Sequence, residues 1–308
     1  MKKKSIGIIG PGKHFSKRIY PLLLNSAFFQ MQGILRSKKI KFKNVKVFKE
    51  KNFFREKFDF IYISAPNKLH EKFIIKSLKN DSHVICEKPF VTSKKNIKKI
   101  LNLSKSRQKL VFESFAYVYH PVFNFIKQII NKKKYGDIKY VISNFRYPPL
   151  NLKDNKYNVK GGDGFYNDSG TYLVSLENYL FNSDNRNVKI QSQKIRKRVD
   201  LRGNIFINSA KIKKFYFWGA GQNYSNNLEI FFSKGSIFIN KFFSKNDDEK
   251  IYVKIYEKNK SIEKVFKQTN QFERMFEKII KNYNKKSFQE YNRKKIEKQI
   301  NLLHICKN

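Results

Sequence analysis

A glycine-rich segment near the start of the sequence has the residue types and spacing of a phosphate-binding turn. It reads Gly7-Ile-Ile-Gly10-Pro-Gly12-Lys13-His14-Phe15. Gly10 allows a tight turn and Gly12 lets a diphosphate approach the backbone, while the start of the following helix offers free N–H groups to the anion. Phe15 stands where a complete motif has its third glycine. The segment therefore predicts a dinucleotide site that includes Lys13, His14 and Phe15, and a plain glycine turn is the alternative.

The residues after the second expected strand bear on the type of dinucleotide. An NAD-preferring fold has an aspartate or a glutamate there, which holds the ribose 2′-hydroxyl. This sequence has Arg36-Ser37-Lys38-Lys39 instead. A guanidinium, a hydroxyl and an ammonium suit a 2′-phosphate, and no carboxylate is present to repel it. Arg36, Ser37 and Lys38 therefore favour NADP(H) over NAD(H). The alternative is that these cations occur here by chance, because the whole chain is rich in basic residues.

Further motifs follow the glycine turn in a fixed order. They are Ser64-Ala-Pro66-Asn67-Lys-Leu-His70, Glu87-Lys88-Pro89, Glu113-Ser-Phe115-Ala-Tyr117-Val-Tyr-His120-Pro121, Gly161-Gly162-Asp-Gly164 and Asp168-Ser-Gly170-Thr-Tyr172. This order resembles the Gfo/Idh/MocA family of NAD(P)-dependent oxidoreductases over nearly the whole chain. The Glu-Lys-Pro and Asp-x-Gly-x-Tyr motifs are the most specific parts of the resemblance.

The resemblance implies a role for the matched residues near the cofactor. The dinucleotide would lie against Ala65, Pro66, Asn67, His70, Glu87 and Lys88. Lys88 would also help to polarise or orient the reacting C–O group, because a fixed cation stabilises negative charge that develops on oxygen. A solvated surface lysine is the alternative. A cis peptide bond before Pro89 is expected.

Tyr172 follows Asp168 by four residues, a spacing that puts both side chains on one face of a helical turn. By the resemblance, Tyr172 would donate a proton to a ketone oxygen, or accept one in the reverse direction. Because a phenol has an ordinary pKa of about 10, a neighbouring cation such as Lys88 would matter. Asp168 would bind substrate hydroxyls or orient Tyr172. The chain has 17 tyrosines, so a packing role for Tyr172 is the alternative.

Two histidines are further candidates. His70 would begin a helix beneath the cofactor, where structural and binding roles are both open. His120 precedes Pro121 at the junction of the two expected domains and is a candidate substrate ligand. No cluster of His, Cys, Asp or Glu has the spacing of a metal site, so no metal is expected. The GxSxG and GxxxxGK(S/T) patterns are absent from the sequence, which leaves serine hydrolases and P-loop proteins without support.

The elements that must position these residues change in character along the chain. Strands are expected at 5–9, 32–35, 45–48, 58–64 and 83–86, alternating with helices at 17–24, 68–78 and 94–104. After a helix at 123–130, strands dominate at 138–145, 188–197, 205–211, 214–218, 227–232, 236–243 and 251–257, with helices at 170–180 and 271–283. The expected fold class is α/β: an N-terminal Rossmann domain with a doubly wound parallel sheet (residues 1–120) and a C-terminal α+β domain with an open, mainly antiparallel sheet (residues 121–308).

The composition of the chain bears on what the protein could bind and on the compartment in which it works. The formal net charge is +42, which by itself suggests nucleic acid or an anionic surface. However, the basic residues are dispersed, and Lys, Asn, Ile, Phe and Tyr are abundant together, as in a genome biased towards A and T codons. A basic field that attracts phosphorylated ligands is the alternative. Two cysteines outside any CxxC pair favour a reducing, cytoplasmic compartment, and no apolar run is long enough for a signal peptide or a membrane span.

The resemblance implies an NADP(H)-dependent oxidoreductase that transfers hydride to or from a carbinol or keto carbon. The expected substrate is a sugar, a cyclitol or a nucleotide-linked keto-sugar. The alternatives are a catalytically idle NADP sensor of the same fold and, with less support, a basic nucleic-acid-binding protein. Members of the resembled family often associate through the outer sheet face, so a homodimer or a homotetramer is expected.

Overall fold

The computed structural model describes residues 2–35, 42, 45–151, 157, 164–181, 188–195, 199–209 and 211–305. These residues divide into two compact units, which are described separately. Unit 1 consists of Met1–Ser114 and Met275–Ile300, and unit 2 of Phe115–Arg274 and Asn301–Asn308. The domain boundary expected near residue 120 did not include the return of Met275–Ile300 to unit 1.

Unit 1 contains a six-stranded sheet in which every pair of neighbours is parallel. Its strands, in spatial order, are β3 (Lys46–Phe48), β2 (Phe29–Leu35), β1 (Lys4–Ile9), β4 (Phe60–Ile63), β5 (His83–Glu87) and β6 (Val111–Ser114). The order 3-2-1-4-5-6 is that of the doubly wound Rossmann fold, which places its ligand site where β1 and β4 diverge. The fold class expected for this unit is confirmed.

The central strand β4 explains why helices cover both faces of this sheet. All four of its residues are buried, as parallel strands require. Ile61 and Ile63 belong to the apolar cluster formed with α3 (His70–Lys79) and α4 (Ile97–Ser106). On the opposite face, the ring of Phe60 contacts Tyr283 and the ring of Tyr62 contacts Phe276.

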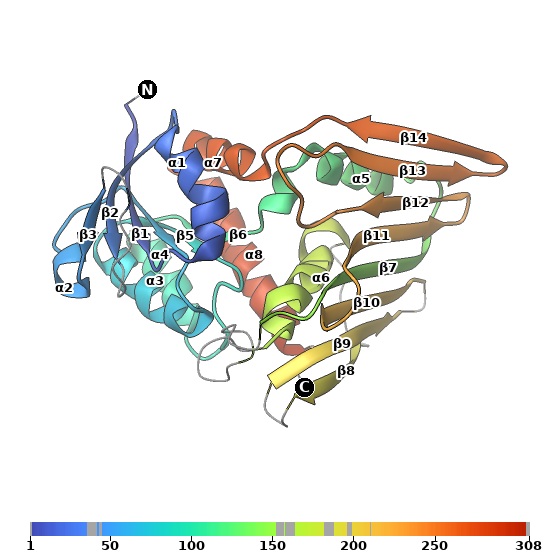
Figure 1. Cartoon of the computed structure of the whole chain (residues 1–308), viewed down its shortest axis with the longest axis horizontal. Helices are drawn as coiled ribbons and strands as arrows, with labels where there is room; N and C mark the ends of the chain where they lie inside the picture. The colour runs from blue at the N-terminus through green and yellow to red at the C-terminus, as the bar shows by residue number, and fades with distance from the viewer. Residues whose placement is uncertain are drawn as a thin grey trace. The chain divides into compact units, whose positions relative to one another are not determined.

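The remaining helical segments of unit 1 come from both ends of the chain (Figure 1). They are the π-helical turn η1 (Phe15–Ile19), α1 (Tyr20–Leu24), α2 (Glu50–Phe53), the 3-10 turn η2 (Asn67–Leu69), most of α7 (Gln271–Asn282) and most of α8 (Lys286–Ile305). Phe276 of α7 also packs against Phe29 of β2, with ring centroids 5.5 Å apart. These aromatic contacts are why the C-terminal helices belong to the first unit.

Unit 2 contains an eight-stranded sheet that is antiparallel except where β7 pairs with β10. Its strands, in spatial order, are β14 (Lys260–Phe266), β13 (Ile251–Glu257), β12 (Gly235–Asn240), β11 (Ser225–Phe232), β7 (Ile138–Tyr147), β10 (Lys213–Ala220), β9 (Val199–Asn208) and β8 (Val188–Ile195). This mainly antiparallel sheet confirms the expectation for the second part of the chain.

One face of the eight-stranded sheet is covered by helices. These are η3 (Ala116–Tyr119), α5 (Pro121–Asn131), η5 (Tyr166–Gly170), α6 (Thr171–Leu176) and η6 (Glu177–Phe181). A buried ion pair between Lys214 Nζ of β10 and Glu177 Oε2, 2.5 Å apart, joins the end of α6 to the sheet. Tyr216 also donates a hydrogen bond to Glu177. The helical segment that carries Asp168 and Tyr172 is therefore fixed by charge as well as by packing.

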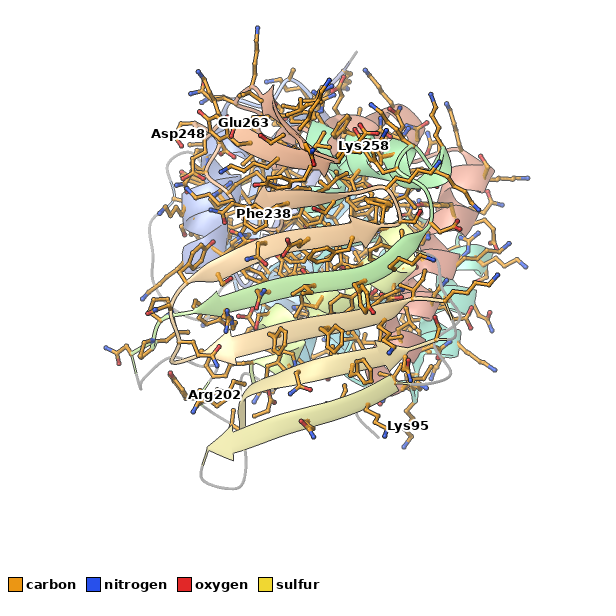
Figure 2. All side chains as sticks on the ribbon, turned by 90° about the vertical axis from the view of Figure 1, so that its right-hand side faces the viewer. Lys95, Arg202, Phe238, Asp248, Lys258 and Glu263 are labelled. Carbon is orange, nitrogen blue, oxygen red and sulfur yellow. The ribbon has the colours of Figure 1, made fainter. Side chains whose placement is uncertain are left out.

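No described helix crosses the other face of this sheet, which Figure 2 shows towards the viewer. Strand residues alternate between the two faces, so the neighbours of core residues point outwards. The outward-pointing residues include large apolar side chains that are exposed by 36–48%, namely Tyr140, Phe217, Tyr252, Tyr256 and Val265. The rings of Phe206 and Phe215 stack on adjacent strands with centroids 4.9 Å apart.

The sequence located most elements but missed α2, β6, β14 and α8. The strand expected at 236–243 ends earlier, at Asn240, because Lys241 adopts a left-handed φ of 54°. Among the described residues, no helix combines the length and apolar character needed to cross a membrane.

Candidate functional site

Gly10 occupies a position that only glycine fits. It follows β1 directly and has a φ of +67°, in the left-handed region. A Cβ at this position would lie 2.6 Å from the Cα of Ala65 and 2.7 Å from its Cβ. The chain leaving β1 therefore touches the chain leaving β4, at the point where a doubly wound sheet binds its ligand.

Gly12 has different surroundings from Gly10. No described atom outside its immediate chain neighbours lies within 4 Å of the position that its Cβ would take. The first helical hydrogen bond runs from the N–H of Ser16 to the carbonyl oxygen of Gly12, at 3.0 Å. Open space beside Gly12 and a helix that begins there fit a bound diphosphate.

The three residues after Gly12 differ in their exposure to solvent. Lys13 and His14 are exposed, and His14 Nδ1 lies 3.8 Å from Glu87 Oε1. Phe15 is fully buried, and its ring packs against Tyr62 with centroids 5.9 Å apart. Phe15 thus supports the turn from the core, in place of the close helix–strand contact that a third glycine allows.

His70 connects the loops that follow β4 and β5. Its Nδ1 lies 2.8 Å from the carbonyl oxygen of Pro89, and its Nε2 lies 2.8 Å from that of Ala65. Burial lowers the pKa of His70, whereas the hydrogen bonds to the carbonyl oxygens of Pro89 and Ala65 raise it. The contacts are those of a structural tie between the two loops that carry the candidate cofactor residues.

Lys88 and its neighbours lie at the carboxyl end of β5. The peptide bond between Lys88 and Pro89 is cis, as expected. Glu87 is the last residue of β5, and it accepts a hydrogen bond from the hydroxyl of Tyr62. Burial raises the pKa of Tyr62 well above its ordinary value, so the phenol keeps its proton and acts as the donor. Lys88 itself is partly exposed.

Glu113 is a buried carboxyl beside this loop, and the sequence did not mark it as a candidate site residue. It lies on β6 directly opposite Cys86 of β5 and is 3% exposed. Its Oε1 accepts the N–H of Phe90 at 2.8 Å. Burial raises the pKa of Glu113 to about 8, against the opposing effects of the Phe90 N–H and the charge of Lys88.

Asp168 and Tyr172 belong to unit 2, in the helical segment η5–α6. Asp168 accepts a hydrogen bond from the hydroxyl of Tyr147, at the end of β7. The ring of Tyr172 is surrounded by four aromatic rings at centroid distances of 5.0–5.9 Å, those of Phe115, Tyr117, Phe145 and Phe243. This packing fixes the ring while the side chain stays partly exposed.

His120 caps the start of α5. Its Nδ1 accepts the N–H of Val122 at 3.3 Å, and the residue is 1% exposed. Burial, together with the charges of Lys245 and Arg274, lowers the pKa of His120 to about 3. In the described part of the chain its Nε2 has no hydrogen-bond partner. A neutral structural cap accounts for these contacts, and its predicted role as a substrate ligand stays a prediction.

The structure therefore brings together, at the carboxyl edge of the parallel sheet, the candidates from the loops after β1, β4 and β5. Arg36, Ser37 and Lys38, expected to select the dinucleotide, lie outside the described residues, as do Gly161 and Gly162. The sequence missed Tyr147 and Glu113 as partners of the candidate residues. Among the described residues, no three or more His, Cys, Asp or Glu side chains are grouped to hold a metal ion.

Comparison with protein families accounts for both units. Residues 4–115 match a model described as an oxidoreductase family with an NAD-binding Rossmann fold. Residues 123–238 match the model of the GFO/IDH/MocA C-terminal domain. The two matches follow one another along the chain, and together they cover the glycine turn, Lys88, Asp168 and Tyr172.

Curated relatives match the chain over part of their length. It is 25% identical over 192 residues to the dTDP-3,4-didehydro-2,6-dideoxy-alpha-D-glucose 3-reductase of Actinomadura kijaniata, covering 62% of this chain and 58% of that protein. It is 25% identical over 126 residues to the trans-1,2-dihydrobenzene-1,2-diol dehydrogenase of Xenopus laevis, covering 41% and 38%. The chain thus spans less than two thirds of the length of these curated relatives.

Solved structures match almost the whole chain. One is a 3-ketoreductase from Actinomadura kijaniata in complex with TDP-benzene and NADP, with a TM-score of 0.91 at 19% identity over 99% of this chain and 97% of that one. Another is the aldose-aldose oxidoreductase of Caulobacter crescentus complexed with glycerol, with a TM-score of 0.84 at 14% identity over 99% and 97%. At these identities the likeness establishes the fold.

Proposed function

Because the chain belongs to the Gfo/Idh/MocA family of oxidoreductases, we propose that it transfers hydride between NADP(H) and a carbinol or keto carbon of a sugar-like substrate. The observation that carries the proposal is the turn at Gly10. Its left-handed backbone and its contact with Ala65 leave no room for a side chain where β1 and β4 diverge. A turn of this kind, followed by a helix and by open space beside Gly12, fits a dinucleotide diphosphate.

The protein would bind the cofactor through three loops. The diphosphate would lie against Gly10, Gly12 and the start of the helix at Phe15, with Lys13 and His14 exposed beside it. The loops that His70 connects would contact the rest of the dinucleotide through Ala65, Pro66, Asn67 and Glu87. The 2′-phosphate of NADP(H) would be held by Arg36, Ser37 and Lys38. The nicotinamide, when bound, supplies or accepts the hydride. The protein orients the reactants, supplies a proton and stabilises the charge that develops on the substrate.

The proton would move through Tyr172. As a keto carbon is reduced, its oxygen gains negative charge, and the phenol of Tyr172 donates a proton to that oxygen. Lys88 would stabilise the same developing charge with its ammonium group. Asp168, which Tyr147 orients, would accept hydrogen bonds from substrate hydroxyls. In the oxidising direction each of these steps runs in reverse.

A nucleotide-linked keto-sugar is the substrate class that the charge favours. The net charge of +42 creates a positive field that raises the local concentration of anions such as a nucleoside diphosphate. Relatives described as acting on dTDP-linked sugars, and one solved with TDP-benzene, support this choice. A neutral sugar or a cyclitol is the alternative within the same chemistry.

Self-association through the face of the eight-stranded sheet that no described helix crosses, called the uncovered face below, is also part of the proposal. Exposed aromatic side chains in a continuous sheet are typical of protein–protein interfaces, because their burial removes apolar area from water. The stacked pair Phe206 and Phe215 adds a flat aromatic surface to this face. A homodimer formed in this way, or a homotetramer, would bury that surface.

The first experiment is a fluorescence titration of the protein with NADPH and with NADH. We expect NADPH to bind at least about tenfold more tightly, since a 2′-phosphate adds charge-assisted hydrogen bonds. Equal affinity would remove the assigned role of Arg36, Ser37 and Lys38. Absence of binding by either dinucleotide would contradict the proposed function as a whole.

The second experiment tests the chemical roles with a panel of keto-sugars, both free and linked to a nucleotide. Lys88→Ala and Tyr172→Phe should each lower kcat by about a hundredfold or more, because each removes a group that acts on the reacting oxygen. The exposed residues Lys79 and Tyr252 supply the matched controls Lys79→Ala and Tyr252→Phe. A loss below about tenfold in both test variants would contradict the assigned roles. NADPH binding without turnover on any substrate would instead fit a sensor.

A further inference from the structure

A buried carboxyl lies beside the candidate catalytic lysine and has no assigned role. Glu113 is 3% exposed, and its Oε1 accepts the N–H of Phe90. Its second oxygen, Oε2, is also buried, and no described residue offers it a hydrogen bond. A carboxylate in such a place would have one backbone donor for two charged oxygens, which is poor compensation for the loss of water.

The charges around Glu113 come from one neighbouring strand and the loop that follows it. Cys86 and Glu87 belong to β5, and Lys88 begins the loop that returns through Pro89 to Phe90. The charges of Glu87 and Lys88 both act on Glu113, in opposite directions. From α7, the neighbour of β6 is Met275, whose sulfur accepts a hydrogen bond from Ser114 and which does not titrate.

We propose that Glu113 is a positioning residue for Lys88, kept as an uncharged carboxylic acid so that it does not neutralise the ammonium group. The inference rests on the proposed function, because it gives Lys88 the task of stabilising charge on the substrate oxygen. Through Oε1 the acid fixes the N–H of Phe90, and with it the backbone that turns away after Lys88. Because Glu113 keeps its proton, it forms no buried ion pair with Lys88, and the positive charge of Lys88 stays available to the substrate oxygen.

The proposal has a consequence at high pH. Burial raises the pKa of Glu113 to about 8, so the acid loses its proton above that pH. The resulting carboxylate attracts the ammonium group of Lys88 and weakens its effect on the reacting oxygen. The rate of reduction should therefore fall on the alkaline side through ionisation of Glu113.

The protonation state can be measured without turnover, by infrared difference spectroscopy of the full-length protein. We expect a carbonyl band of a protonated carboxylic acid at neutral pH, which shifts on labelling with ¹³C-glutamate and disappears above about pH 8. The band should be absent from Glu113→Gln and present in the control Glu56→Gln, since Glu56 is exposed. A spectrum without this band at pH 6 would overturn the proposal. Should Glu113→Gln fail to fold, titration of the labelled wild-type band near pH 8 would still decide it.

The functional test compares pH profiles on the keto-sugar that the panel identifies. Glutamine keeps the acceptor for Phe90 and cannot ionise. Below about pH 8, Glu113→Gln should therefore keep kcat within about threefold of the wild type, and above it the alkaline fall should be missing. A loss of kcat in Glu113→Gln as large as that in Lys88→Ala at every pH would overturn the proposal. If no keto-sugar is turned over, the proposed function fails while the infrared band still reports on Glu113.

Discussion

The hydroxyl of Tyr147 donates a hydrogen bond to Asp168, the carboxylate that we propose to contact substrate hydroxyls. An ionised carboxylate accepts hydrogen bonds in several directions, so a fixed donor on one side leaves the other lone pairs directed elsewhere. Tyr147 ends β7, whereas Asp168 lies in η5, 21 residues further along the chain. The orientation of Asp168 thus depends on a residue from a different element.

Replacing Tyr147 by phenylalanine tests this arrangement at the residue scale. Loss of this hydrogen bond should weaken the orientation of Asp168, and we expect kcat/KM for a keto-sugar to fall by about tenfold, the value of a hydrogen bond to a charged group. The dissociation constant for NADPH should not change, because Tyr147 belongs to unit 2. Tyr140→Phe is the matched control, since Tyr140 is on the same strand and 47% exposed. Wild-type kinetics in Tyr147→Phe would contradict a role for this bond.

Residues with a local signature could be predicted, and residues defined by a distant partner could not. Gly10 and the cis bond before Pro89 follow from short motifs, because the backbone conformations they need are restricted to few residue types. Tyr147 is one of 17 tyrosines, and nothing next to it in the sequence marks it. Glu113 belongs to a segment that matches a family motif, but its sequence neighbours do not show that it is buried. Its contact with Phe90, in the loop after β5, exists only in the folded protein.

The turn between β1 and the first helix allows a prediction at the scale of an element. Gly10→Ala should lower the free energy of unfolding by at least about 2 kcal/mol, because its φ is positive and the new methyl group would collide with Ala65. Gly12→Ala should change stability by less than about 0.5 kcal/mol, because the space around it is open. Denaturant unfolding measures both changes.

The same pair of variants separates folding from binding. Gly12→Ala should weaken NADPH binding by about tenfold or more, since its methyl group would enter the space that the diphosphate approaches. The fluorescence titration described above measures this change in a protein of normal stability. Wild-type affinity in Gly12→Ala would mean that the diphosphate does not lie against this turn.

Elements with a clear apolar pattern were predicted, and those without one were missed. The strand β4 has four consecutive buried residues, and β11 alternates buried and half-buried side chains, so each has the pattern of its type of sheet. The helix α8 buries Gln289, Asn292 and Gln299, and these polar residues interrupt the apolar stripe that would have indicated a helix. The strand β6 is as short as β4, but two of its four buried residues are the polar Glu113 and Ser114, so it lacks a continuous apolar run.

The oligomeric state of the whole protein should depend on the uncovered sheet face. A double variant, Tyr140→Lys with Phe217→Lys, should convert the proposed homodimer to a monomer, because it places charges where apolar area would be buried. Leu24→Lys is the control, since Leu24 is 48% exposed on α1 and belongs to unit 1. Analytical ultracentrifugation measures the change. A wild-type protein that is monomeric at micromolar concentrations would contradict self-association through this face.

Salt should strengthen the same association. Each copy has a formal net charge of +42, so two copies repel one another at long range. At 0.15 M ionic strength the Debye length is about 8 Å, and added salt screens this repulsion while it leaves apolar burial intact. The dimer dissociation constant should therefore decrease as salt increases.

The return of Met275–Ile300 to unit 1 has a consequence for how the protein is made. During synthesis, residues 1–114 emerge from the ribosome long before Met275 is added. The nascent parallel sheet therefore lacks α7 and α8 during that interval. During that interval Phe29, Phe60, Tyr62 and Phe112 lack the rings of Phe276, Tyr283 and Phe288, and these aromatic surfaces are open to chaperones and to neighbouring nascent chains. Premature termination anywhere before Met275 leaves these rings without their partners, because the 26 residues Met275–Ile300 complete the unit that begins with the first 114.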